Sequence, residues 1–202
     1  MLDDTRLHEA LELLGALLAE RSQPFEVLAI GGGGLLLLGI SRRVTADLDI
    51  AARKKGERWM KSRPLPPDLV QAVADVADAM ELDKGKPWLN DGPSFLFEMG
   101  LPRGWEARTT RREFGALVIE ILGREDIIKL KLWAATDARA RERRARDVSD
   151  LKQLAPTREE VVDALRWCNA KDGTDSFVTS SGVLLILRDL GFVIDPSEGT
   201  GG

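Results

Sequence analysis

The sequence has little of several features that would point to a particular class of protein. Its 202 residues include one cysteine, Cys168, which excludes an intrachain disulfide framework and favours a reducing compartment. The longest apolar run, residues 35–38 with their flanking glycines, is far too short to span a bilayer. A formal net charge of −4 excludes a global basic surface, so any nucleic-acid contact needs a local patch. Since no signal peptide is visible, we expect a cytoplasmic protein without a membrane partner.

Two apolar segments separated by glycines come before a pair of aspartates. A strand is predicted over residues 25–30, a glycine turn over 31–34 and a short buried helix over 35–38. After a basic turn, a second strand is predicted to carry Asp47 and Asp49. Residues two apart on a strand point to the same face, so the two carboxylates should project together.

The paired carboxylates and the glycine-rich bend indicate a metal–phosphate site. Neighbouring carboxylates repel each other unless a cation lies between them, and the hard ions Mg²⁺ and Mn²⁺ prefer oxygen ligands. Glycines also let a phosphate approach the backbone N–H groups at the start of a helix. Each part has a simpler interpretation: a glycine run is often a tight turn or packing point, and a lone Asp-x-Asp is often a solvated strand end.

The string GG-x-x-x-x-x-x-G, followed by R-x-T-x-D-x-D, resembles the signature of the nucleotidyltransferase superfamily. Within that superfamily it is most similar to the AbiEii-like and MenT-like toxins and their relatives. Its positions in this chain are Gly31, Gly32, Gly39, Arg43, Thr45, Asp47 and Asp49. The resemblance implies an α/β (α+β) fold, with a small mixed sheet flanked by helices and a helical C-terminal part.

The same resemblance implies the chemistry and the residues that carry it. Enzymes of this family transfer a nucleoside monophosphate from a nucleoside triphosphate to a hydroxyl acceptor. Asp47 and Asp49 would then be catalytic and hold the metal. The glycine turn and its neighbours would bind the triphosphate: Gly31, Gly32, Gly33, Arg43 and Thr45. Many members have serine where this chain has Gly33, so one hydroxyl contact to phosphate is expected to be missing.

A third strand, predicted over residues 114–122, carries Glu120 as its only carboxylate. In many nucleotidyltransferases the third catalytic acid lies on such a strand and faces the aspartate pair. The resemblance therefore gives Glu120 a catalytic role, either as the general base for the attacking hydroxyl or as a further ligand of the metal.

A second informative stretch, residues 123–154, combines an apolar helix with many arginines. It resembles the K-L-x-A … R-x-x-x-x-R-D-x-x-D-L motif of the AbiEii-like group, here Lys131, Leu132, Ala134, Arg146, Asp147, Asp150 and Leu151. The resemblance implies that Lys131 contacts the nucleotide phosphate and that Asp147 belongs to the active site. As alternatives, Lys131 extends to water along the helix, and the aspartates pair with neighbouring arginines at helical spacing.

The remaining patterns outline the organisation of the chain. We expect an α/β core over residues 1–123, a helical part over 124–196 packed on it, and a disordered tail over 197–202. Residues 53–67 read as a basic loop, which either attracts a phosphate backbone or is simply solvated. In the irregular segment 84–104 and just beyond it, Trp88 and Trp105 could stack on a base or pack in the core.

Together these patterns predict a metal-dependent nucleotidyltransferase that uses Mg²⁺ or Mn²⁺ and a nucleoside triphosphate. The resemblance points to tRNA or a protein as the acceptor, with a small molecule such as an aminoglycoside as a further option. It also implies a cognate antitoxin as a partner in a toxin–antitoxin pair. The alternative is a catalytically inactive nucleotide-binding or protein-interaction module with the same fold.

Overall fold

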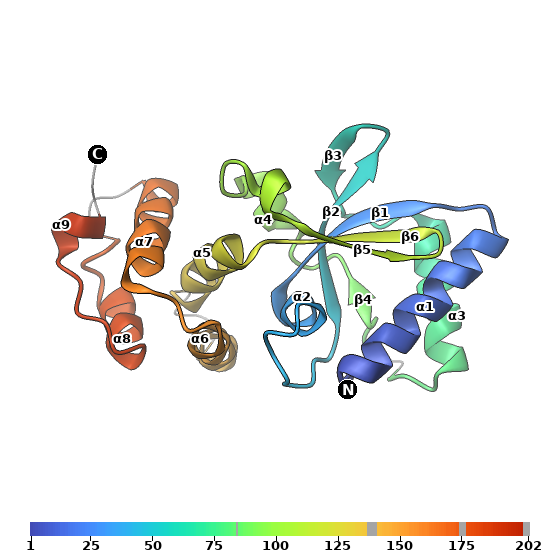
Figure 1. The fold of residues 1–202 in the computed structure, drawn as a ribbon, viewed down its shortest axis with the longest axis horizontal. Helices are drawn as coiled ribbons and strands as arrows, with labels where there is room; N and C mark the ends of the chain where they lie inside the picture. Colours follow the sequence, from blue (N-terminus) through green and yellow to red (C-terminus); the bar gives the residue numbers. More distant parts are fainter. Residues whose placement is uncertain (84, 137–140, 174–176, 200–202) are drawn as a thin grey trace. The chain divides into compact units, whose positions relative to one another are not determined.

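The computed structural model describes residues 1–83, 85–136, 141–173 and 177–199, with the backbone alone for 141–143. Over this part the chain is mixed α/β, which confirms the predicted fold class, and it divides into two compact units, Met1–Gly123 and Arg124–Gly202. The sheet belongs to the first unit, and the second is helical (Figure 1). Among the described helices, none combines the length and the apolar character needed to cross a bilayer.

The first unit is built around a mixed sheet. Its elements in chain order are α1 (Asp4–Glu20), β1 (Phe25–Ile30), α2 (Gly31–Leu37), β2 (Leu48–Lys55), β3 (Arg58–Lys61), α3 (Pro67–Ala79), β4 (Leu89–Asn90), α4 (Ser94–Met99), the 3₁₀ helix η1 (Trp105–Arg108), β5 (Thr110–Phe114) and β6 (Leu117–Ile121). The strand order is β3-β2-β1-β6-β5, and β4 pairs with β2. β1 runs parallel to β6 and antiparallel to β2.

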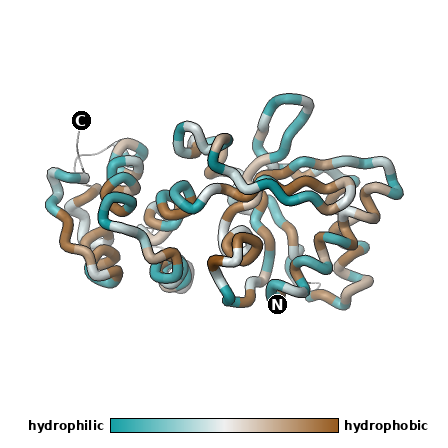
Figure 2. Tube along the Cα trace, viewed as in Figure 1, coloured by the Kyte–Doolittle hydropathy of each residue, from teal (hydrophilic) through white to brown (hydrophobic). Residues whose placement is uncertain are grey.

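Helices α1 and α3 lie side by side and form the main core with one face of the sheet (Figure 1). Leucines at helical spacing in α1 are fully buried, and Asp3 caps the helix by accepting a hydrogen bond from the Arg6 N–H. Strands β1 and β6 contribute hydrophobic residues to this core (Figure 2).

Gly15 brings α1 into backbone contact with the turn between β5 and β6. The Ala116 N–H donates a hydrogen bond to the Gly15 carbonyl at 3.2 Å. A Cβ at Gly15 would lie 1.7 Å from the Phe114 carbonyl oxygen, so no other residue fits without moving the helix.

An irregularity in β2 sets which side chains share a face of the sheet. Leu28 of β1 pairs with Ala52, whereas the next residue, Ala29, pairs with Ile50. Ala51 is therefore left without a partner in β1 and forms a bulge, which reverses the alternation of the residues on its two sides.

The bulge gathers polar side chains on the face of the sheet away from α1 and α3. Asp49 lies opposite Ile30, and Lys54 is ion-paired with Glu26 at 3.0 Å, so Asp49 and Lys54 share that face although five positions separate them. On the other side of β1, Glu120 of β6 pairs with Leu28 and also points to this face.

Two sequence predictions about the first unit are wrong. The glycines at 31–34 are not a turn before a helix, because α2 begins at Gly31 and includes all four of them. Residues 53–61 are not a loop: β2 continues to Lys55, and β3 pairs with it to form a hairpin. The hairpin forms despite its charges because Gly56, at φ +59°, provides the turn and Trp59 packs on Trp105.

The second unit consists of α5 (Arg124–Ala135), α6 (Arg141–Leu154), α7 (Arg158–Asp172), α8 (Ser181–Asp189) and α9 (Pro196–Gly199). The start of α7 has a capping box, in which Thr157 and Glu160 each bond the other's backbone N–H. The disorder expected from residue 197 is not found through Gly199, because Ser197 bonds Asp195 and Gly199 is buried against Val178. Residues 200–202 lie outside the described part.

Candidate functional site

The junction between β1 and α2 requires glycine for two reasons. Gly31 has φ +75°, a left-handed conformation that side chains with a Cβ rarely adopt. A Cβ at Gly31 would also lie 2.5 Å from Asp49 Oδ2. The carboxylate of Asp49 is therefore held directly against the backbone of the glycine run.

Asp49 is fixed by the strands on either side of it. It lies at the start of β2, opposite Ile30 of β1 and beside Asn90 of β4. The side-chain amide of Asn90 donates a hydrogen bond to Asp49 Oδ1 at 3.3 Å. Nothing in the sequence singled out Asn90, because it lies 41 residues away in an irregular segment.

Asp47 comes just before β2, so the expectation that both aspartates lie on one strand holds only for Asp49. Its backbone is fixed by Thr45, whose hydroxyl donates to the Asp47 carbonyl at 3.0 Å. Thr45 is in turn tied to the N-terminal segment, because it exchanges two backbone hydrogen bonds with Leu2. The backbone position of Asp47 thus depends on a loop that hydrogen bonds hold to the N-terminal segment.

Arg43 and Thr45 lie beside the second glycine of the run. From the position of a Cβ at Gly32, the Thr45 hydroxyl is 3.5 Å away and Arg43 Nη2 is 3.6 Å away. The structure therefore brings together five of the predicted site residues: Gly31, Gly32, Arg43, Thr45 and Asp49. The group joins a carboxylate, a guanidinium, a hydroxyl and closely approachable backbone, which suits a metal-bound phosphate.

Gly33 is buried against the loop that carries the aspartates. A Cβ there would lie 2.8 Å from Leu48 Cδ1 and 3.0 Å from the Asp47 carbonyl oxygen. The serine that the resemblance leads one to expect at this position does not fit unless the start of β2 shifts.

Replacing Gly33 by serine is expected to lower the free energy of unfolding by about 1–3 kcal/mol, because the added atoms overpack this contact. Denaturant unfolding followed by circular dichroism measures the change. Gly32→Ser is the matched control, since a Cβ at Gly32 meets its neighbours only at ordinary contact distances. Equal losses in the two variants would contradict the steric explanation.

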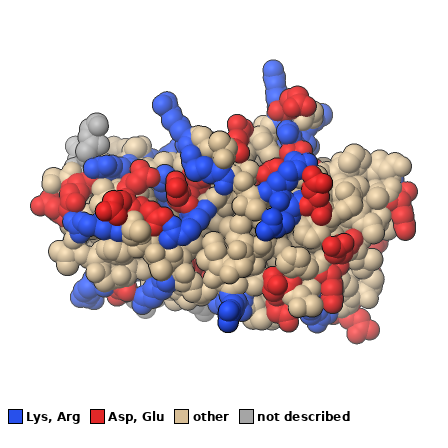
Figure 3. All heavy atoms as spheres, in the orientation of Figure 1, with Lys and Arg blue, Asp and Glu red and all other residues tan. Residues whose placement is uncertain are grey.

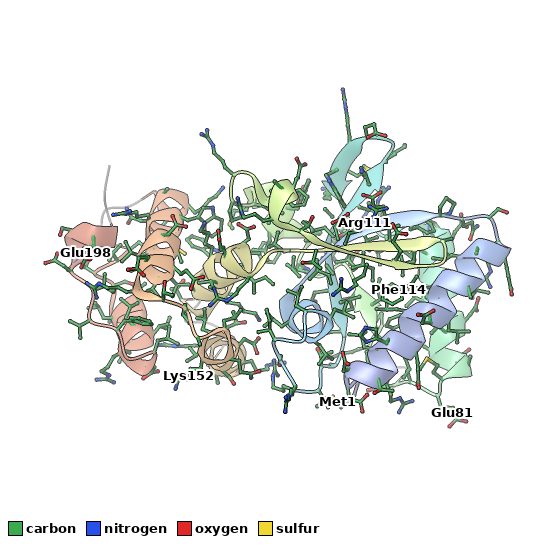
Figure 4. All side chains as sticks on the ribbon, in the orientation of Figure 1. Met1, Glu81, Arg111, Phe114, Lys152 and Glu198 are labelled. Carbon is green, nitrogen blue, oxygen red and sulfur yellow. The ribbon has the colours of Figure 1, made fainter. Side chains whose placement is uncertain are left out.

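Glu120 lies on β6, although the predicted strand 114–122 is divided by the turn at Gly115 into the end of β5 and β6. Its carboxylate accepts a hydrogen bond at 3.0 Å from Arg111 of β5, the residue labelled in Figure 4. Hydrogen bonds to Glu113 and Glu120 raise the pKa of Arg111. Glu120 shares the sheet face of Asp49, and its catalytic role stays a prediction.

Lys131 and Asp147 come together within the second unit. Lys131 Nζ lies 2.7 Å from Asp147 Oδ1 and 2.7 Å from Asp150 Oδ2, and the two aspartate side chains are 6% and 1% exposed. Burial by itself would lower the pKa of Lys131, but the charges and hydrogen bonds of Asp147 and Asp150 outweigh burial and raise it. Sequence reasoning missed that Asp150 shares this lysine, and the phosphate contact of Lys131 stays a prediction.

Three of the other residues considered for contact with nucleic acid have partners in the protein. Trp88 is buried and donates its indole N–H to the Val73 carbonyl, so it packs in the core. Two lysines of the β2–β3 hairpin pair with carboxylates, Lys54 with Glu26 and Lys61 with Glu98. Basic and acidic side chains lie close together in this region of the surface (Figure 3).

The donor set at the start of β2 fits a hard divalent ion. Within the described ranges, no three histidine, cysteine, aspartate or glutamate side chains gather as a ready-made metal site. Mg²⁺ is commonly held by one or two carboxylates together with substrate phosphates and water. Asp49 supplies one such carboxylate, and Asp47 is predicted to supply the second, so a metal here would be shared with a phosphate ligand.

Comparison of the chain with models of known protein families, with curated proteins and with solved structures finds no match in any of the three. The resemblance to the nucleotidyltransferase superfamily thus rests on the residues of the sequence motif alone, and it stays a prediction.

Proposed function

We propose that the protein is a metal-dependent nucleotidyltransferase that moves a nucleoside monophosphate from a nucleoside triphosphate to a hydroxyl acceptor. One observation carries the proposal: the Asp49 carboxylate lies against Gly31, with Arg43 and Thr45 beside Gly32. Gly31 and Asp49, which are 18 positions apart in sequence, thereby come into contact where α2 and β2 begin. Such an arrangement suits a triphosphate whose oxygens need both a metal and hydrogen-bond donors.

Each residue of the group has a defined task in this mechanism. Asp47 and Asp49 would hold Mg²⁺ or Mn²⁺, which when bound offsets the negative charge of the triphosphate. Arg43, Thr45 and the backbone at Gly32 orient the phosphate oxygens. The acceptor oxygen bonds to the α-phosphorus, the bond from that phosphorus to the bridging oxygen breaks, and pyrophosphate leaves. Glu120, on the same face of the sheet as Asp49, takes the proton of the acceptor hydroxyl.

The acceptor follows from the resemblance alone. It points to tRNA or a protein, and to a cytoplasmic toxin held in check by a cognate antitoxin. A small molecule such as an aminoglycoside is the remaining acceptor class. Pools of total RNA, total protein and small hydroxyl compounds separate these acceptors in one experiment.

Triphosphates labelled at the α-phosphorus are expected to transfer label to one of these pools, whereas the same triphosphates labelled at the γ-phosphorus transfer none. Removing divalent ions with EDTA should abolish the transfer, and adding Mg²⁺ should restore it. Scintillation counting of the separated pools measures both effects. Transfer of the γ-label would instead indicate a kinase and contradict the proposal.

A second candidate is a nucleotide-binding module without transferase activity. It is favoured by the Lys131 cluster, in which both predicted catalytic residues of the second unit, Lys131 and Asp147, are ion-paired with each other. Calorimetry with each triphosphate, with and without Mg²⁺, distinguishes the two. Metal-dependent binding without any transfer of α-label would support the module.

A further inference from the structure

A cavity of about 270 Å³ lies on the polar face of the sheet in the first unit. It lies between β1, the β2–β3 hairpin, η1 with the segment after it, and β6, and it opens to solvent, where Glu57 and Glu106 are exposed. Its lining residues are Glu26, Lys54, Glu57, Trp59, Trp105, Glu106, Thr109 and Glu120. Four carboxylates, one ammonium and two indoles therefore surround one space.

The charges of this cavity do not balance. Glu26 is paired with Lys54 at 3.0 Å, and Glu120 is paired with Arg111 at 3.0 Å. Glu57 and Glu106 have no ion pair within the part of the chain that the structure describes. The lining thus has two carboxylates more than its cations neutralise, which disfavours an anion and favours a positively charged occupant.

The aromatic walls point to the same class of ligand. Trp59 and Trp105 meet edge to face with their ring centroids 5.5 Å apart, and both are half-buried. Phe97 packs on Trp105 at 6.5 Å and braces the pair. Indole rings attract ammonium groups through their π-electrons and cover methylene chains with apolar surface.

The cavity already contains one ammonium group of the chain itself. Lys54 Nζ lies 5.8 Å from the centroid of the Trp59 ring and 3.0 Å from Glu26 Oε1. The hydrogen bond that Lys54 donates to Glu26, together with the charges of Glu26 and Glu57, raises the pKa of Lys54, so these surroundings favour the charged amine. Lys54 thus shows that an ammonium group fits between a carboxylate and an indole of this cavity, as a ligand amine beside Glu57 or Glu106 would.

We propose that this cavity binds a small aliphatic diamine or polyamine. Its ammonium groups pair with Glu57 and Glu106, and its methylene chain packs on Trp59 and Trp105. The proposal does not depend on the nucleotidyltransferase activity, since the lining shares only Glu120 with the predicted site and the groups that would bind the ligand are Glu57, Glu106 and the two indoles.

Isothermal titration of the full chain with putrescine and spermidine, in the absence of nucleotide, tests the proposal. Saturable binding is expected at or below about 1 mM, with spermidine the tighter ligand and with butanediol, the uncharged analogue of putrescine, not binding. Glu57→Gln with Glu106→Gln should weaken spermidine at least about tenfold. Trp59→Leu should weaken it several-fold through loss of the cation–π contact.

The control is Glu12→Gln with Glu20→Gln, which removes the same charge from exposed positions of α1. The proposal is overturned if this control weakens binding as much as the cavity variant does, if butanediol binds equally well, or if no saturation occurs up to about 10 mM. Melting temperatures identify any variant that fails to fold. The two glutamine variants keep the test decisive, because they leave the packing of Trp59 unchanged.

Discussion

Replacing Asp49 by asparagine is expected to reduce the transfer of α-label by at least about a hundredfold while the protein stays folded. Asparagine has nearly the same shape, so the packing against Gly31 and the neighbouring Asn90 is largely preserved. The negative charge that would hold a divalent ion is lost. The initial rate of label transfer and the melting temperature, measured on the same preparation, separate loss of chemistry from loss of fold.

Asp47→Asn is expected to have an effect of similar size, because the two carboxylates would share one ion. Asp68→Asn, at an exposed position in the first turn of α3, removes the same charge away from the site and should leave the rate unchanged. A rate for Asp49→Asn above about half that of the unmodified protein would remove Asp49 from the mechanism.

Replacing Lys131 by methionine should lower the free energy of unfolding by about 3–5 kcal/mol, because it leaves two buried carboxylates without their shared cation. Lys129→Met is the matched control on the same helix. Lys129 pairs with Asp163, whose side chain is 60% exposed, so that variant should lose about 1 kcal/mol or less. Urea unfolding of both variants gives the comparison.

The same ion pairs set a pH dependence. Because the folded-state pKa of Lys131 is raised, its contribution to stability is complete below its ordinary pKa of 10.5. That contribution is lost as the pH rises through the higher folded-state value. The stability difference between the unmodified protein and Lys131→Met should therefore shrink only in strongly alkaline solution. If the variant instead keeps its stability and binds triphosphate more weakly, Lys131 is a phosphate ligand.

Local patterns predicted the parts of the fold whose residues determine their own conformation. The apolar run that forms β1 is one such part, because its pattern depends only on neighbouring residues. The β2–β3 hairpin was missed because its charged residues pair with distant partners, such as Lys54 with Glu26. Tertiary contacts there outweigh the local polarity.

The candidate site likewise contains some residues that the sequence identified and others that it could not. The motif associated Asp49 with the glycine run, and the chain path from β1 through α2 to β2 returns the aspartate to the start of α2. Asn90 and Asp150 could not be inferred, because their contacts depend on which strand or helix packs beside them. The close packing around Gly33 could not be inferred either. The sequence shows only that serine is absent at this position, and not that a side chain has no space there.

The bulge at Ala51 has a consequence for how this strand can change. Deleting that single residue would restore perfect pleating, and one half of β2 would then turn over relative to the other. In one case the Asp49 side chain would face the hydrophobic core beneath α1. In the other, Lys54 would lose its ion pair with Glu26 and face that core. Both outcomes place a charge among leucines, so one small alanine keeps the two ends of the strand facing the same way.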